Sequence, residues 1–126
     1  MKRICLLTMA LLFVTSSVAF AGEGKIAVAA NGETPAASVS AQAGPAPFFL
    51  IFDEGGKFIE ALANPDKKAA SSGIAIVDFL AGKGATVIVA EGFGPKIVEV
   101  MKGKGIKAVS FKGSAEEAVK KILKSN

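Results

Sequence analysis

The chain has 126 residues, with 15 lysines and arginines against 11 acidic residues and no histidine, a formal net charge of +4. Its one cysteine, Cys5, lies in the N-terminal apolar segment, so a mature chain without that segment has neither a thiolate nor an imidazole. This composition excludes zinc, copper, haem and iron–sulfur sites built from Cys or His within one mature chain. It also excludes Ser–His and Cys–His nucleophilic catalysis.

The first 21 residues have the three-part pattern of a secretory signal peptide. Lys2 and Arg3 come first, an apolar run follows over residues 4–14, and Ala19 and Ala21 form a site for cleavage after Ala21. The apolar run is shorter than the roughly 20 residues that a membrane-spanning helix needs. We therefore expect a periplasmic or secreted protein with no stable membrane anchor after cleavage. A retained anchor is the alternative.

Cleavage leaves residues 22–126, which is enough for one α/β domain with its own core. Loss of Lys2 and Arg3 leaves 13 basic residues against 11 acidic ones, a net charge of +2. The remaining basic residues are all lysines, scattered singly or in pairs, with no arginine for bidentate phosphate contacts. We therefore expect no nucleic-acid partner.

The first half of the mature chain predicts three strands. Residues 25–30, KIAVAA, read as a strand, and the Gly-, Pro-, Ala- and Ser-rich stretch 31–47 reads as a loop. The segment FFLIFD at 48–53 is continuously apolar, which predicts a central strand buried on both faces. A tight turn at 54–56 leads into a partner strand at 57–63. These three strands should form an antiparallel meander.

The second half alternates helices and strands. Apolar residues at helical spacing, a proline at a helix start and glycines at helix ends mark the segments. In chain order they are a helix over 72–83, a strand over 85–91, a helix over 95–105 and a strand over 106–111. Ser114 and Glu117 have the spacing of a capping box, which predicts a last helix after Ser114. The order βββαβαβα predicts a mixed five-stranded sheet with helices packed on it.

The segment EGFGPK, residues 91–96, lies where a strand ends and a helix begins. Backbone amides at a helix N-terminus attract anions, Gly92 and Gly94 allow close approach, and Lys96 adds positive charge. The segment lacks the full dinucleotide fingerprint and the Walker spacing. It is a candidate ligand-binding loop, with a tight strand–helix connection as the alternative. Phe93, flanked by glycines, would suit a ligand or partner surface if exposed.

Several segments, in order along residues 25–123, resemble the dinitrogenase iron-molybdenum cofactor biosynthesis family. They are KIAVAANG, VSAQAGPAPFFLIFD, the NP pair at 64–65, GIAIVDFLAGKGATVIVAEGFGP and GIKAVSFKGSAEEAVKKIL. The resemblance implies the ribonuclease H-like fold of that family and a Gly-x-Gly-Pro loop like the one at 91–96. It does not imply ribonuclease activity, because fold and function separate readily.

Members of this family commonly carry one histidine in the opening loop and often another before the glycine that starts the first helix. Such members bind or carry iron–molybdenum or iron–sulfur cluster species. In this chain Gln42 occupies the first position, and Ser71-Ser72-Gly73 the second. The resemblance therefore implies a cluster-binding loop without its ligand. Gln42, Gly44, Ser71 and Ser72 remain candidates to hydrogen-bond a cluster or small anion, or they satisfy backbone groups in a turn.

Together, the residues and the resemblance predict a small exported binding or carrier module with reduced or lost cluster ligation. We expect no catalysis, because no acid–base pair or nucleophile is identifiable, and no metal-ligating side chain. Asp53 and Glu54 precede Gly-Gly at a strand end and read as turn residues rather than a hard-metal site. The alternative is a periplasmic protein-interaction or regulatory domain without a small-molecule ligand, which would work through a sheet edge or a homodimer surface.

Overall fold

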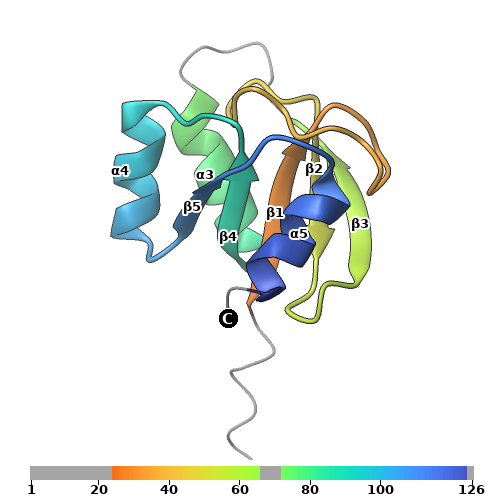
Figure 1. Ribbon diagram of the computed structural model, residues 1–126. Coiled ribbons are helices and arrows are strands. Elements are labelled where there is room, and N and C mark those ends of the chain that lie inside the picture. The colour runs from red at the N-terminus through yellow and green to blue at the C-terminus, as the bar shows by residue number, and fades with distance from the viewer. Residues whose placement is uncertain (1–23, 66–71, 125–126) are drawn as a thin grey trace, which may run out of the picture.

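The computed structural model describes residues 24–65 and 72–124, which form one mixed sheet with three helices (Figure 1). In chain order the elements are β1 (Lys25–Ala30), β2 (Phe48–Phe52), β3 (Phe58–Ala63), α3 (Ser72–Gly82), β4 (Ala85–Ala90), α4 (Pro95–Gly103), β5 (Lys107–Ser110) and α5 (Ala115–Lys124). The predicted α/β order βββαβαβα is confirmed. The predicted signal peptide and Ser71 lie outside the described residues.

The five strands lie in the order β3-β2-β1-β4-β5. The first three pair antiparallel, which confirms the predicted meander, and β2 is a buried inner strand as expected. The second half of the sheet is parallel, because β4 pairs with β1 on one side and with β5 on the other. β1 is therefore central: Val28 lies opposite Leu50 of β2 and opposite Val89 of β4.

Side chains alternate between the two faces of the sheet, and each face has its own apolar core. On β1, Ala27 and Ala29 join the core under α3 and α4, whereas Ile26 and Val28 join the core under α5. Figure 1 shows this layering, with α5 alone in front of the sheet. None of the helices within 72–124 is long and apolar enough to cross a membrane.

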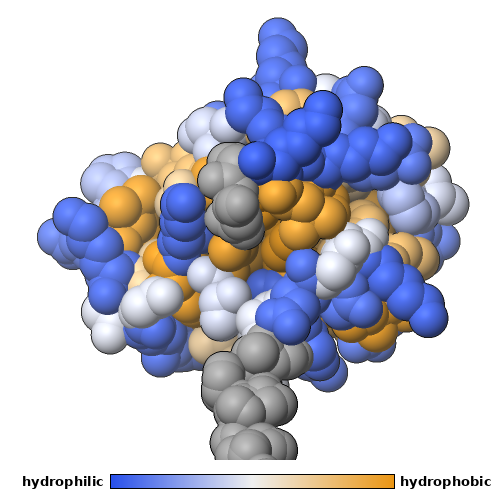
Figure 2. All heavy atoms as spheres, turned by 60° about the horizontal axis from the view of Figure 1, so that its bottom comes forward, coloured by the Kyte–Doolittle hydropathy of each residue, from blue (hydrophilic) through white to orange (hydrophobic). Residues whose placement is uncertain are grey.

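The single helix α5 covers less of its face of the sheet than α3 and α4 together cover of the other face. α5 contacts mainly the central strand β1. On β4, Val89 is fully buried, but Val87 is only half-buried and Thr86 is exposed. At the end of the molecule where β1 and β4 begin, hydrophobic residues gather in the middle of the surface, bordered by hydrophilic ones (Figure 2).

Two short polar motifs form as their sequences predict. At the start of α5, the Ser114 amide donates to Glu117 Oε1 at 3.0 Å and the Glu117 amide donates to Ser114 Oγ at 3.2 Å, which is a complete capping box. In the turn between β2 and β3, Asp53 Oδ1 accepts hydrogen bonds from the amides of Gly55 and Lys57, both at 2.9 Å. The Asp53 carboxylate therefore stabilises the turn, as predicted for a turn residue.

We predict that Leu50→Asp unfolds the domain, because Leu50 is 0% exposed at the centre of the sheet. An unpaired buried carboxylate costs several kcal/mol, a large share of the stability of a domain this size. The matched control is Ile59→Asp on β3, where Ile59 is 44% exposed and the cost should stay within about 1 kcal/mol. Urea denaturation checks this, and equal midpoints for both variants would contradict the strand assignment.

Candidate ligand-binding site

The sheet topology brings the two candidate loops to one edge. β1, β3, β4 and β5 run in the same direction, so their carboxyl ends share the edge at the top of Figure 1. After β1 the chain crosses to β2, whereas after β4 it turns the other way into α4 and β5. Ligands of open α/β sheets bind in the crevice at such a topological switch point.

Backbone pairing joins the two loops beyond the ends of β1 and β4. Gln42 and Gly92 form a parallel bridge. Beside it, the Glu91 amide donates to the Ser40 carbonyl oxygen at 2.9 Å, and the Ala43 amide donates to the Gly92 carbonyl oxygen at 3.3 Å. The sequence predicts each loop separately as a candidate but does not predict this contact, because backbone atoms make it and no side-chain pattern marks it.

The two glycines of the second loop have different surroundings. A Cβ placed on Gly92 would lie 3.3 Å from the Ala41 carbonyl oxygen, so this glycine lets the two loops approach each other. A Cβ placed on Gly94 would have no heavy atom within 4 Å, and Gly94 has ordinary extended backbone angles. The absence of a side chain at Gly94 therefore leaves the surface at the start of α4 open.

The N-terminus of α4 keeps free donors at this edge. Gly94 is its N-cap and supplies no side-chain cap, and Pro95 occupies the first turn. The Val98 amide donates to the Gly94 carbonyl oxygen at 3.1 Å, so the amides of Lys96 and Ile97 precede the first i→i−4 bond of the helix. The Lys96 side chain is exposed beside them. Amides, helix dipole and lysine all favour an anion here.

Gln42 and Gly44 have different roles in the first loop. The Gln42 side chain is exposed and makes no hydrogen bond to another described residue, while its carbonyl oxygen accepts one from Ser40 Oγ at 3.0 Å. Gly44 is buried, and its carbonyl oxygen accepts a hydrogen bond of 2.8 Å from Asn64 Nδ2, which also donates to the Ala46 carbonyl oxygen at 2.7 Å. Gln42 therefore faces solvent, and Gly44 anchors the loop to the end of β3.

Phe93 is a candidate for a ligand or partner surface only if it is exposed. Phe93 is half-buried and packs against the core on the α3 and α4 side of the sheet. Burial of apolar surface draws the ring inward even though glycines flank it. Ser72 begins α3 at the same edge as the two loops, and Ser71 lies outside the described residues.

The groups gathered at this edge suit hydrogen bonding to an anion better than coordination of a metal. Within residues 24–65 and 72–124, no three His, Cys, Asp or Glu side chains are grouped so that they could hold a metal ion. The available groups are the amide side chain of Gln42, the backbone amides at the start of α4 and the Lys96 ammonium. Such donors stabilise negative charge but are not ligands for soft iron–sulfur species.

The family model described as dinitrogenase iron-molybdenum cofactor matches residues 24–125. The chain belongs to this family. The match spans every strand and helix of the domain and so includes both loops of the candidate site. Among curated proteins, none matches the chain.

Solved structures are similar over most of the domain. The apo form of the orange protein from Desulfovibrio gigas is 27% identical, with a TM-score of 0.75, over 80% of this chain and 88% of that one. A proposed NifB protein from Thermotoga is 25% identical, with a TM-score of 0.70 and the same coverage. A proposed dinitrogenase from Methanocaldococcus jannaschii is 10% identical over the same shares, with a TM-score of 0.56, and supports the fold alone.

We predict that Gly92→Val destabilises the domain more than Gly94→Val does. At Gly92 the new side chain must push against the Ala41 carbonyl, and overpacking of this kind costs about 1–3 kcal/mol. At Gly94 the side chain has open space, so the loss is that of a weaker N-cap, about 1 kcal/mol or less. Urea denaturation of both variants checks the order, and the reverse order would contradict the loop pairing.

Proposed function

We propose that this chain is a binding or carrier module of the dinitrogenase iron-molybdenum cofactor family and that it does not catalyse a reaction. The ligand is an anionic species held where the loop at 40–44 meets the loop at 91–96. The backbone bridge between Gln42 and Gly92 carries the proposal, because it sets an exposed amide side chain beside the free donors of α4 at the switch point of the sheet.

The family's iron–molybdenum cofactor or a related iron–sulfur species is the proposed cargo, with ligation by protein side chains reduced or lost. Gln42 occupies the position where the family resemblance implies a histidine, and a neutral amide is a poor partner for iron. The site therefore suits a preformed anionic cluster bound through hydrogen bonds and the Lys96 charge. That a related orange protein has a distinct apo form supports a role in taking up a separate group.

We also propose that the chain is exported and that its signal peptide is cleaved. The motivation is the basic start, the apolar run and the Ala19-Phe20-Ala21 site. Intact-mass measurement on the exported protein should place the mature N-terminus at Gly22 or within about two residues of it. A mature product that keeps residues 1–14 would contradict export as a soluble periplasmic or secreted protein.

Restoring a ligand should restore cluster binding. We expect Gln42→His, alone or with Ser72→His, to retain more iron per chain than wild type after anaerobic reconstitution with ferrous iron and sulfide. Absorbance in the iron–sulfur region and metal analysis are the measurements. Thr86→His near the start of β4 is the matched control, because it adds an exposed imidazole at the opposite edge of the sheet from the two loops and should gain nothing.

The helix start can be tested separately. Gly94→Val should bind molybdate more weakly than wild type does, because the new side chain obstructs the amides at the start of α4.

Two outcomes would contradict the proposal. If wild type already binds a full complement of cluster and Gln42→Ala leaves it unchanged, the ligands come from elsewhere and the lost-ligand interpretation must be dropped. If wild type binds neither cluster nor molybdate, a protein-interaction role replaces the carrier role.

A further inference from the structure

Strand β5 forms one edge of the sheet and, within the described residues, pairs with β4 alone (Figure 1). Three of its four residues, Lys107, Ala108 and Ser110, are exposed, and Val109 is half-buried. An edge strand presents a row of unpaired backbone donors and acceptors, so another extended chain can pair with it.

The hydrogen bonds to β4 show which backbone groups of β5 face outward. The Phe111 amide donates to the Ala90 carbonyl oxygen at 3.1 Å, and Ala90 lies opposite Ser110. In a parallel pair, one residue directs both its backbone groups to the neighbouring strand, and the next directs both away. Val109 therefore bonds to β4, whereas the amide and carbonyl groups of Ala108 and Ser110 point out of the sheet.

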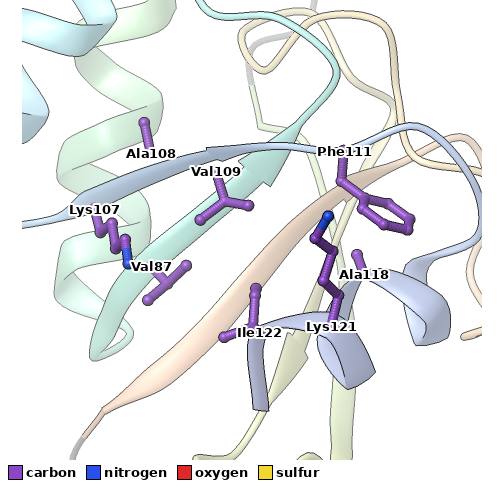
Figure 3. Close-up of a pocket in the computed structure, with 8 residues that line it drawn as sticks. All are labelled: Val87, Lys107, Ala108, Val109, Phe111, Ala118, Lys121 and Ile122. Atoms are coloured by element: carbon purple, nitrogen blue, oxygen red, sulfur yellow. The ribbon is translucent and has the colours of Figure 1, made fainter. Parts of the chain in front are cut away.

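An apolar groove runs beside this edge on the α5 face of the sheet (Figure 3). It exists because α5 contacts mainly β1 and leaves β4 and β5 partly uncovered. Val87 of β4, Val109 of β5 and Ile122 of α5 are half-buried in its lining, and Figure 3 shows their side chains directed into the groove. A side chain from an added strand that covered this apolar surface would gain about 25 cal/mol per Å².

The charge along β5 is positive. Residues 100–115 include four lysines and no acidic residue. Lys107 begins the strand, Lys112 lies two residues past its end, and both are exposed without an ion pair to a described residue. Lys104 pairs with Asp78 at 2.9 Å, so its charge is offset. A segment with negative charge complements this edge better than a neutral or basic one.

The opposite edge of the sheet is a poorer template for an added strand. The pairing of β3 with β2 is interrupted by a register shift between Ile51 and Phe52. Exposed Lys57 and Glu60 give this edge mixed charge. Irregular pairing distorts an edge, and mixed charge favours neither an acidic nor a basic partner.

We propose that β5 binds an extended acidic segment of another protein, which pairs with Ala108 and Ser110 as an added strand. Apolar side chains of that segment lie over Val109 beside the groove, and acidic residues at its two ends pair with Lys107 and Lys112. This surface includes no residue of the loops at 40–44 and 91–96, so it is independent of the proposed cluster cargo.

Three peptides test the proposal by titration into the mature chain. The first, acetyl-Glu-Glu-Val-Thr-Val-Glu-Glu-amide, has the same sequence in both directions and so suits either strand orientation. The second has lysine in place of each glutamate. The third has proline in place of threonine, which removes a backbone donor at unchanged charge. We expect the first to bind about tenfold or more tightly than either of the others.

Amide hydrogen exchange by NMR locates the bound peptide. With the acidic peptide bound, the amides of Ala108 and Ser110 should exchange about tenfold or more slowly, and those of β3 should not change. Equal affinity for the acidic and lysine peptides, or no protection at Ala108 and Ser110, overturns the proposal.

A charge-reversed variant tests the two lysines. Lys107→Glu with Lys112→Glu should weaken binding of the acidic peptide about tenfold and should strengthen binding of the lysine peptide. Lys57→Glu with Lys120→Glu is the matched control, because it changes net charge equally at exposed lysines away from β5. An equal loss in both double variants overturns the proposal, since the effect then comes from overall charge.

A backbone variant tests the strand pairing itself. Ser110→Pro removes one outward amide and leaves the bonds to β4 in place, and edge strands tolerate proline at such positions. It should stay folded by circular dichroism and lose most of its affinity for the acidic peptide. A folded Ser110→Pro variant that binds this peptide as wild type does would refute strand addition.

The competing occupant of the edge is a second copy of this chain. Antiparallel pairing of two β5 strands would bring Lys107 of each chain toward Lys112 of the other, and like charges oppose such pairing. Sedimentation should therefore show a monomer that binds the acidic peptide. A dimer that Ser110→Pro dissociates and that the peptide does not bind would show that the partner is a second copy, which overturns the proposal.

Discussion

The parallel pairing of β1 with β4 is the contact on which the rest of the structure depends. It joins the antiparallel meander of the first half to the helix–strand alternation of the second, with Val28 opposite Val89 at its centre. After β1 the chain crosses to β2 on one side of this pair, and after β4 it crosses to β5 on the other side. Beyond the strand ends, the loop that follows β1 pairs with the loop that follows β4 at the bridge between Gln42 and Gly92. The β1–β4 pairing thus unites the sheet, and the bridge beyond it brings together the two loops of the proposed site.

The helices cover the two faces of the sheet unequally, which explains why apolar side chains are partly exposed on one face only. Two helices seal one face, where Ile76, Leu80 and Met101 are almost fully buried. The single helix α5 seals only the centre of the other face and leaves Val87 and Val109 half-buried. The domain therefore leaves apolar surface partly uncovered on the α5 face, in addition to the polar edge with backbone donors at the start of α4.

Most of the fold could be predicted from the sequence, because hydrophobic periodicity, Pro95 and the capping box at Ser114 are local signals with local causes. The site was predicted only in part. Gln42 and the loop at 91–96 were identified from resemblance and helix-terminus physics, but their contact rests on backbone pairing between distant segments, which no residue type encodes. Whether Phe93 is exposed was likewise left open by its flanking glycines, because its packing against the core depends on tertiary contacts.

The central claim is that the paired loops at the carboxyl edge of β1 and β4 bind an anion. The most direct measurement is a backbone amide NMR titration of the mature chain with molybdate. We predict the largest shifts at Gln42, Gly94, Lys96 and Ile97, with saturation at one site and little change in β2 or β3. Shifts confined to the lysines of α5, or scattered without saturation over the whole surface, would contradict the claim.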